Sequence, residues 1–413
     1  MSFSTGISHS RSVICNGLKV IAINGQFPGP IVNVTTNYNL VVNVQNDLDE
    51  PLLITWDGIQ HRKNSWQDGV LGTNCPIPSG WNWTYQFQVK DQIGSFFYFP
   101  SINLQRAAGG YGGIIVNNRQ VIAVPFGKPD EDITIFVGDW YNRNHTVRPR
   151  MPDGVLINGK GPYRYNTTLP EFRIQNHNML LVETEGSYTV QQNFTNLDIH
   201  VECKRWRCPS QPSRIFQYGS INVTQVYLLR NKPPVVINGK RRTTLNGLSY
   251  VPPTTPLRLA DQFDVKGVYA LDFPTRPIVG PPRTSSSIIN GTYRGFIEII
   301  FVNNDTTVQT YHMDGYAFFV DGLWEWTESS RGTYNKWDGV ARCTTQVYPG
   351  AWTAILVSLD NVGVWNVRTE NLDTWYLGQE TYIQVVNPEQ TNKTELAPPD
   401  NVLYCGLLQS KQK

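Results

Sequence analysis

The sequence predicts an all-β protein built from tandem β-sandwiches. Aromatic residues make up 12% of the 413 residues and charged residues only 16%. No long stripe of Leu, Ala, Glu and Lys indicates an amphipathic helix, and this profile favours strands. Short segments alternate apolar and polar residues and end at turn residues. One turn motif also recurs at the scale of a domain.

The expected strands lie in both halves of the chain and are short. Asn and Asp residues follow several of them, where turns are expected. A proline-rich passage, Val251–Leu257, is expected to be a loop. The segments with the clearest alternation or β-branched content are Leu40–Val44, Tyr85–Val89, Phe296–Val302, Ala354–Leu359 and Thr381–Val386.

The recurring motif is Ile-Asn-Gly, found in Ile23–Gln26, Ile157–Lys160 and Ile237–Lys240. Asn-Gly after an apolar run indicates a tight hairpin turn, so one sandwich unit is used three times. We expect domains at 1–123, 124–230 and 231–413, of which the middle one is incomplete. Inside it, Val201–Ser213 lacks strand alternation and carries a charge run. We therefore expect easy proteolysis there.

The charge balance excludes two classes of partner. The chain has 35 basic and 33 acidic residues, which leaves a net charge of +2. This charge is too small to indicate a protein that binds nucleic acid or a membrane surface. No apolar run is long enough to predict a transmembrane segment.

Asn-x-Thr sequons, the acceptors of N-linked glycans in the secretory route, point to an extracellular protein. Against this, Met1–Val20 has no apolar run of the kind a secretory signal needs, so we expect a truncated amino terminus. The tail after Cys405 is short and polar and gives no lipid-anchor signal. The sequons begin at Asn33, Asn82, Asn144, Asn166, Asn193, Asn222, Asn290, Asn304 and Asn392.

The six cysteines do not have the spacing of a zinc site. They stand far apart, and the two closest, Cys203 and Cys208, lie in a basic context without histidines nearby. A structural disulfide or two is the expected use. The partners of Cys15, Cys203, Cys208 and Cys343 stay open.

Several motifs resemble those of the blue multicopper oxidases. They are Asn24–Pro30, Trp66–Gly69, Gly94–Val116 and Tyr348–Ala354. Within that superfamily, Ile54–Gly58 and Trp375–Gln379 are similar to the plant multicopper-oxidase-like cell-wall glycoproteins of the skewed-growth type, often labelled ascorbate oxidase homologues. The resemblance implies cupredoxin-like (plastocyanin-like) Greek-key sandwiches, a cell-wall location and a disulfide between Cys75 and Cys405.

The same resemblance assigns positions to copper ligands, and almost none holds a ligand residue. Copper in such sites needs neutral imidazoles and, at the blue site, a thiolate. We therefore predict no copper cofactor and no catalytic residue, with His312 as the single vestige. The three-copper positions fall on Thr55, Asp57, Phe99, Ser101, His312, Asp314, Arg368 and Glu370. The blue-copper positions fall on Gln309, Thr369, Thr374 and Gln379.

The vacated three-copper positions carry three carboxylates and one guanidinium. We expect a buried, metal-free charge network in which Arg368 pairs with two of the carboxylates. The third carboxylate is then protonated, pairs with His312 as an imidazolium, or attracts a hard cation through oxygen ligands. These outcomes stay open.

Other residues have a structural and a functional interpretation. His312 is expected to be a hydrogen-bonded histidine rather than a copper ligand. Trp56, Trp66 and Trp365 are expected in the core rather than in a sugar-stacking platform. Gly109–Gly113 is expected at a tight strand crossing, since no helix follows it to make a phosphate cradle. No carboxylate pair outside the vacated positions indicates a glycosidase.

The expected function is that of a non-catalytic, secreted or cell-wall glycoprotein that supports directional cell expansion. Its expected partners are cell-wall polysaccharides or wall proteins. A first alternative is a copper-dependent oxidoreductase, similar to ascorbate oxidase or laccase, that keeps residual copper binding. A second alternative is a wall-polysaccharide-binding module, which needs an exposed row of aromatic residues.

Overall fold

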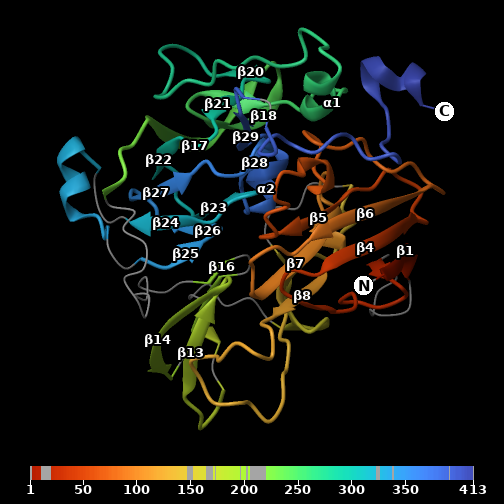
Figure 1. Cartoon of the computed structure of the whole chain (residues 1–413), viewed down its shortest axis with the longest axis vertical. Helices are drawn as coiled ribbons and strands as arrows, with labels where there is room; N and C mark the ends of the chain where they lie inside the picture. The colour runs from red at the N-terminus through yellow and green to blue at the C-terminus, as the bar shows by residue number, and fades with distance from the viewer. Residues whose placement is uncertain are drawn as a thin grey trace. The chain divides into compact units, whose positions relative to one another are not determined.

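The regular secondary structure of the described residues is mostly β-strand, with a few short helices (Figure 1). The computed structural model describes residues 2–10, 20–146, 152–163, 171–172, 174–195, 197–200, 203–204, 220–321, 326–336, 339–389 and 391–412. The chain forms two compact units. Unit 1 comprises residues 1–57 and 77–212, and unit 2 comprises residues 58–76 and 213–413. The expected division into three domains stays a prediction.

Two four-stranded sheets form the first sandwich of unit 1, with the strand orders β2-β1-β4-β6 and β3-β8-β7-β5. Trp56 of one sheet packs against Tyr85 and Phe87 of the other, with ring centroids 5.2 and 5.0 Å apart. Aromatic side chains from both sheets thus fill this core. The strands are β1 (Ser2–Ser10), β2 (Val20–Ile23), β3 (Val32–Thr35), β4 (Asn39–Asn46), β5 (Ile54–Asp57), β6 (Asn82–Gln88), β7 (Gly94–Pro100) and β8 (Gly112–Asn117).

The rest of unit 1 consists of small sheets of two or three strands, β11-β10-β9, β12-β15-β16 and β13-β14. Trp140 and Leu156 of this part pack with Val20 in a small buried cluster. Most of Val201–Ser213 lies outside the described residues, so the expected proteolysis there stays a prediction. The strands are β9 (Val137–Trp140), β10 (Gly154–Ile157), β11 (Lys160–Tyr163), β12 (Glu171–Phe172), β13 (Met179–Thr184), β14 (Ser187–Phe194), β15 (Leu197–His200) and β16 (Cys203–Lys204).

Unit 2 contains an eight-stranded sheet, β20-β19-β18-β17-β22-β27-β24-β25, and a five-stranded sheet, β21-β29-β28-β23-β26. The strands are β17 (Gln225–Ile237), β18 (Lys240–Leu245), β19 (Leu248–Tyr250), β20 (Arg283–Ser285), β21 (Ile289–Thr292), β22 (Phe296–Asn303), β23 (Gln309–Met313), β24 (Phe318–Asp321), β25 (Ala341–Arg342), β26 (Thr344–Val347), β27 (Trp352–Ser358), β28 (Gly363–Thr369) and β29 (Glu380–Val386). The two α-helices among the described residues of unit 2 are short, α1 (Leu257–Gln262) and α2 (Leu372–Tyr376).

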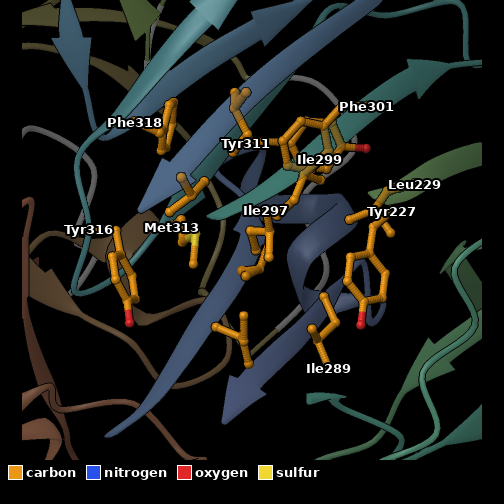
Figure 2. Close-up of a cluster of buried hydrophobic side chains, with 14 of the residues drawn as sticks. Tyr227, Leu229, Ile289, Ile297, Ile299, Phe301, Tyr311, Met313, Tyr316 and Phe318 are labelled. Carbon is orange, nitrogen blue, oxygen red and sulfur yellow. The ribbon is translucent and has the colours of Figure 1, made fainter. Parts of the chain in front are cut away.

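Both sheets of unit 2 contribute to one hydrophobic core. Figure 2 shows part of it, with Ile299 and Phe301 from the larger sheet beside Tyr311 and Met313 from the smaller one. The rings of Phe301 and Tyr311 are stacked, with centroids 4.1 Å apart. This packing of two sheets around one apolar layer is the expected β-sandwich.

Residues 58–76 follow β5 in sequence but belong to unit 2. The backbone N–H of Lys63 donates to Asn361 Oδ1 at 2.7 Å, and that of Gly72 donates to the Tyr382 hydroxyl at 3.1 Å. A disulfide joins Cys75 to Cys405, which confirms the predicted pair. The segment is therefore joined to the rest of unit 2 by a disulfide and by hydrogen bonds.

The three Ile-Asn-Gly motifs form the predicted turns. In each, both Asn and Gly have positive φ, from 47° to 51° at Asn24, Asn158 and Asn238 and from 71° to 74° at the glycines that follow. Successive positive φ values match the twist of a two-residue hairpin. The five expected strands are also present, in β4, β6, β22, β27 and β29, although β6 ends at Gln88 and β27 at Ser358, each one residue before the expected end. In the proline-rich passage the loop ends at Pro256, since Leu257 begins α1.

Gly109–Gly113 makes the expected tight crossing. Gly109 has φ of 117°, and a Cβ there would lie 2.6 Å from the carbonyl oxygen of Ile21. A Cβ at Gly112 would lie 2.4 Å from the hydroxyl of Tyr98. Only glycine allows both approaches. The three tryptophans predicted to be core residues, Trp56, Trp66 and Trp365, are all buried.

Candidate functional site

Four of the residues assigned to three-copper positions lie together in unit 2. We call His312, Asp314, Arg368 and Glu370 the charged cluster. Strands β23 and β28 pair His312 directly with Arg368, and the two acids stand two residues further along the chain. Arg368 Nη1 lies 2.6 Å from Asp314 Oδ2, and Arg368 Nε lies 2.8 Å from Glu370 Oε1. This confirms that Arg368 pairs with two carboxylates.

His312 completes the charged cluster. Its Nε2 lies 2.9 Å from Asp314 Oδ1, and its Nδ1 lies 3.1 Å from the hydroxyl oxygen of Thr344. The prediction of a hydrogen-bonded histidine is therefore confirmed. All four members of the cluster are at most 3% exposed. A charge removed from water so completely is stable only when it is paired.

Burial and charge act against each other in this cluster. Burial disfavours the charged form of Asp314, but the Arg368 guanidinium and the His312 imidazole together hold its pKa below the ordinary value. At the neighbouring His61, burial lowers the pKa to about 3, although the charge of Asp314 acts in the opposite direction. Asp314 is therefore ionised and His61 neutral at physiological pH.

The polar region extends beyond the predicted residues to Glu380. Its Oε2 accepts hydrogen bonds from Trp375 Nε1 at 2.9 Å and from Asn366 Nδ2 at 2.8 Å. The Arg368 guanidinium carbon lies 4.9 Å from the centre of a Trp375 ring. Burial raises the pKa of Glu380, although these donors and Arg368 act to lower it. No sequence signal marked Glu380 except its place directly after the Trp375–Gln379 motif.

The four residues at blue-copper positions also lie together in unit 2. We call Gln309, Thr369, Thr374 and Gln379 the neutral cluster. Gln379 Nε2 donates to Gln309 Oε1 at 2.8 Å and to the Tyr311 hydroxyl at 3.0 Å. The Thr369 hydroxyl donates to Gln309 Oε1 at 3.3 Å, and Thr374 Oγ1 lies 3.5 Å from Thr369 Oγ1. All four side chains are buried.

The remaining three-copper positions lie in unit 1, on β5 and β7 and just after β7. Thr55 stands directly opposite Phe99, and Asp57 opposite Phe97. The guanidinium carbon of Arg106 lies 4.4 Å from the centre of the Phe99 ring, within the range of a cation–π contact. Ser101 follows β7 and is buried, as are Thr55, Asp57 and Phe99.

Sequence patterns of the multicopper oxidase family match residues 8–121, 166–202 and 254–391. The chain is 54% identical to "Monocopper oxidase-like protein SKU5" of Arabidopsis thaliana, over 96% of this chain and 87% of that protein. This chain belongs to the multicopper oxidase family. It is also 38% identical to the "L-ascorbate oxidase homolog" of Brassica napus, over 96% of this chain and 90% of that protein.

Solved structures of the family share the fold. The crystal structure of Fet3p, described as a multicopper oxidase that functions in iron import, matches with a TM-score of 0.76 at 16% identity, over 96% of this chain and 93% of that one. The laccase from Botrytis aclada matches with a TM-score of 0.72 at 18% identity, over 93% and 87%. The predicted cupredoxin-like, all-β class is thereby confirmed.

Three further features concern the sequons, the helices and the cysteines. Among the nine sequon asparagines, Asn166 lies outside the described residues, and the other eight are exposed. In the part of the chain that the structure describes, no helix is long and apolar enough to cross a membrane. Cys343 is buried, whereas Cys15 and Cys208 lie outside the described residues.

Proposed function

We propose that this multicopper oxidase family member is a non-catalytic, extracellular glycoprotein. The observation that carries the proposal is the charged cluster. Arg368 places its guanidinium between Asp314 and Glu370. The family resemblance assigns its position to a copper ligand, so a fixed positive charge replaces a ligand there. A buried cation held by two carboxylates supplies the positive charge itself and disfavours a second cation at the same position.

The chemistry of the donor atoms supports the same proposal. The neutral cluster offers amide and hydroxyl groups that already bond one another, whereas a blue-copper site uses two imidazoles and a thiolate. His312, the imidazole of the charged cluster, has both ring nitrogens within hydrogen-bond distance of protein atoms. These residues do not fit copper.

We further propose a location in the cell wall and a role in directional cell expansion, with wall polysaccharides or wall proteins as partners. The exposure of eight sequon asparagines supports passage through the secretory route. The family resemblance supports the role in cell expansion. The rival sugar-stacking platform of Trp56, Trp66 and Trp365 has no support, since all three side chains are at most 3% exposed.

The test uses glycosylated protein secreted by a eukaryotic host and supplied with copper during expression. Elemental analysis should find copper far below one ion per chain, and the visible spectrum should lack the blue-copper band. Oxygen consumption with ascorbate or phenolic substrates should stay at the level without enzyme, while a working laccase in parallel consumes oxygen. Stoichiometric copper together with substrate oxidation would favour the copper-dependent oxidoreductase instead. Stoichiometric calcium or manganese would favour a hard-cation site over the metal-free network.

A further inference from the structure

The hairpin of β17 and β18 carries a local excess of positive charge. Residues 225–250 contain five basic side chains and no Asp or Glu, whereas the whole chain is nearly balanced, with 35 basic and 33 acidic residues. The charge of the hairpin is therefore a local feature that the net charge of the chain does not show. The five basic residues are Arg230, Lys232, Lys240, Arg241 and Arg242.

Four of these five residues lie on one face of the hairpin. Lys232 of β17 stands directly opposite Thr244 of β18, so the two share a face. Residues two apart on a strand also share a face, which adds Arg242 and Lys240 on β18 and Arg230 on β17. We call Arg230, Lys232, Arg242 and Lys240 the cation row.

The cation row faces away from the hydrophobic core of unit 2. Leu229 and Leu245, the chain neighbours of Arg230 and Thr244, belong to that core. Adjacent residues of a strand point to opposite faces, so the row lies on the outer face. The two lysines of the row are exposed, and its two arginines are half-buried.

The hairpin extends beyond the strands beside it. β22 pairs with β17 only from Gln225 to Asn231, and β19 pairs with β18 only at Leu245. In the part of the sheet that the structure describes, the rest of the hairpin is a ribbon of two strands. At its tip, a Cβ added to Gly239 would meet no atom within 4 Å. A partner can therefore approach the ribbon from outside.

Among the described residues, no Asp or Glu forms an ion pair with a member of the cation row. Other arginines of unit 2 are paired, since Arg258 Nε lies 2.8 Å from Glu395 Oε2 and Arg331 Nε lies 2.8 Å from Glu298 Oε2. The Nε of Arg230 is buried and has no hydrogen-bond partner among the same residues. The positive charge of the row is thus left for a partner outside the chain.

The members of the cation row are evenly spaced along the ribbon. Arg230 stands level with Asn246, whose backbone N–H donates to the Arg230 carbonyl oxygen at 2.9 Å. The row is therefore level with positions 240, 242, 244 and 246 of the chain. Two residues of a strand span about 7 Å, so the four charges form a line about 20 Å long. A single small anion contacts part of this line, whereas a polymer with a negative charge on each repeating unit can contact all of it.

We propose that the cation row binds an anionic wall polysaccharide, a polymer of uronic acids with free carboxylates. Guanidinium and ammonium groups both form charge-assisted hydrogen bonds with carboxylates. Binding of this kind needs no aromatic platform, which agrees with the burial of Trp56, Trp66 and Trp365. The inference rests on the proposed extracellular function and names the class of polysaccharide and the residues that bind it.

The proposed location favours a polysaccharide over other polyanions. Anionic lipids give the cytoplasmic leaflet of a membrane its negative potential, and an extracellular protein does not face that leaflet. Nucleic acids are not components of a cell wall. An acidic protein segment lacks the regular repeat of charge that matches an evenly spaced row.

The experiment measures binding of the secreted, glycosylated full chain to calcium-free polygalacturonate fragments by titration calorimetry. The row variant carries Lys232→Gln, Lys240→Gln and Arg242→Gln. The control variant loses the same charge at exposed positions elsewhere, with Lys90→Gln, Arg283→Gln and Lys393→Gln. We expect the row variant to bind about 100-fold more weakly, because each cation near an anionic surface contributes about fivefold. The control variant should bind like the wild type.

Two further measurements test the role of charge. Wild-type binding should weaken as salt is added, and fully methyl-esterified polygalacturonate, which is uncharged, should not bind. A charge-keeping variant with Lys232→Arg, Lys240→Arg and Arg242→Lys should bind like the wild type. If the row variant is not secreted, Lys232→Gln and Lys240→Gln are measured singly, and each should weaken binding about fivefold.

Equal loss of affinity in the row and control variants, or tight binding of the esterified polymer, would overturn the inference. Tighter binding of anionic lipid vesicles, double-stranded DNA or polyglutamate than of polygalacturonate would also overturn it, in favour of that partner. Copper content and oxygen consumption of the same preparations test the proposed function separately. A copper-free, inactive protein that does not bind polygalacturonate would contradict only this inference.

Discussion

The charged and the neutral cluster differ although strand β28 contributes a residue to each. Arg368 and Thr369 are neighbours on β28, and adjacent residues of a strand point to opposite faces. On one face the side chains form ion pairs, and on the other they form a chain of uncharged hydrogen bonds. Both sets are buried in unit 2. The comparison shows that the polar groups of a buried site can be satisfied either by ion pairs or by neutral hydrogen bonds. The two arrangements differ in how much stability is lost when one residue is removed.

The difference lies in what remains when one member is removed. In the charged cluster, loss of Arg368 leaves two carboxylates without their common partner, and an unpaired buried charge is strongly destabilising. In the neutral cluster, loss of one amide leaves dipoles that are easier to satisfy, and Gln309 Oε1 still accepts from Thr369. The charged cluster should therefore be the more sensitive of the two to substitution.

The largest expected effect is that of Arg368→Ala. It should lower the free energy of unfolding by about 3–5 kcal/mol, because it leaves two buried carboxylates without their partner. Denaturant unfolding of the intact secreted protein, followed by intrinsic fluorescence, measures the change. A matched control is the triple variant Arg368→Met, Asp314→Asn and Glu370→Gln, which removes the charges together and should recover much of the loss. A neutral effect of Arg368→Ala would show that the ion pairs do not stabilise the fold.

The next effect is that of Gln379→Leu in the neutral cluster. It removes the donor to Gln309 and Tyr311 and should cost about 1–3 kcal/mol, which is less than Arg368→Ala costs. The same unfolding measurement checks it. A second variant, Gln379→Glu, introduces a charge among neutral groups and should lower the free energy of unfolding more than Gln379→Leu does. If Gln379→Leu cost as much as Arg368→Ala, the comparison between the clusters would fail.

Much of the fold and of the site could be predicted from the sequence for local reasons. The Asn-Gly turns need positive φ at two successive residues, a requirement that side-chain chemistry reveals directly. The pairing of Arg368 with two acids follows from charge alone, once the family resemblance places the residues at neighbouring positions. Because buried charges must be paired, few other arrangements were open to Asp314 and Glu370.

Other features could not be predicted because they depend on distant packing. Within residues 58–76, the implied disulfide of Cys75 with Cys405 was the one pointer to unit 2. The contacts of Lys63 and Gly72 with Asn361 and Tyr382 could not be foreseen, since they span about 300 residues. Glu380 lies on an ordinary strand, and only the burial of its carboxyl makes it part of the polar region. Periodicity records which face of a strand is buried but not which residues meet there.

The third prediction separates the clusters by pH. The folded-state pKa of Asp314 lies below its ordinary value of 3.8, so its contribution to stability is present above pH 3.8 and is lost as the pH falls through the folded pKa. The penalty of Asp314→Asn should therefore shrink in acid. The penalty of Gln379→Leu should stay constant, because no member of the neutral cluster titrates there. Unfolding midpoints measured from pH 7 to pH 3 decide this, and parallel curves for the two variants would contradict it.

His61 adds a second acid-dependent contribution in the same unit. Burial lowers its pKa from 6.5 to about 3, so the unfolded state binds a proton near pH 6.5 that the folded state does not. Stability from this group is present above pH 6.5 and decreases as the pH falls from 6.5 toward 3. His61→Gln should flatten the upper part of the pH profile, between 6.5 and the carboxyl range, where the contribution of Asp314 does not change with pH. A profile unchanged in that window would show that His61 is not buried in its neutral form.

The smallest expected effect is that of Glu380→Gln. Unlike the other substitutions, it should stabilise the protein at neutral pH. Burial raises the pKa of Glu380, so the folded state holds the proton more tightly than the unfolded state. Ionisation then opposes folding as the pH rises through the ordinary carboxyl range toward the raised pKa. Glutamine keeps an acceptor oxygen for Trp375 and Asn366 but cannot ionise. The variant should be equal to the wild type in acid and slightly more stable at neutral pH, by less than about 1 kcal/mol. A clear loss of stability at neutral pH would instead mean that the ionised carboxylate is paired with Arg368, which would make Glu380 a member of the charged cluster.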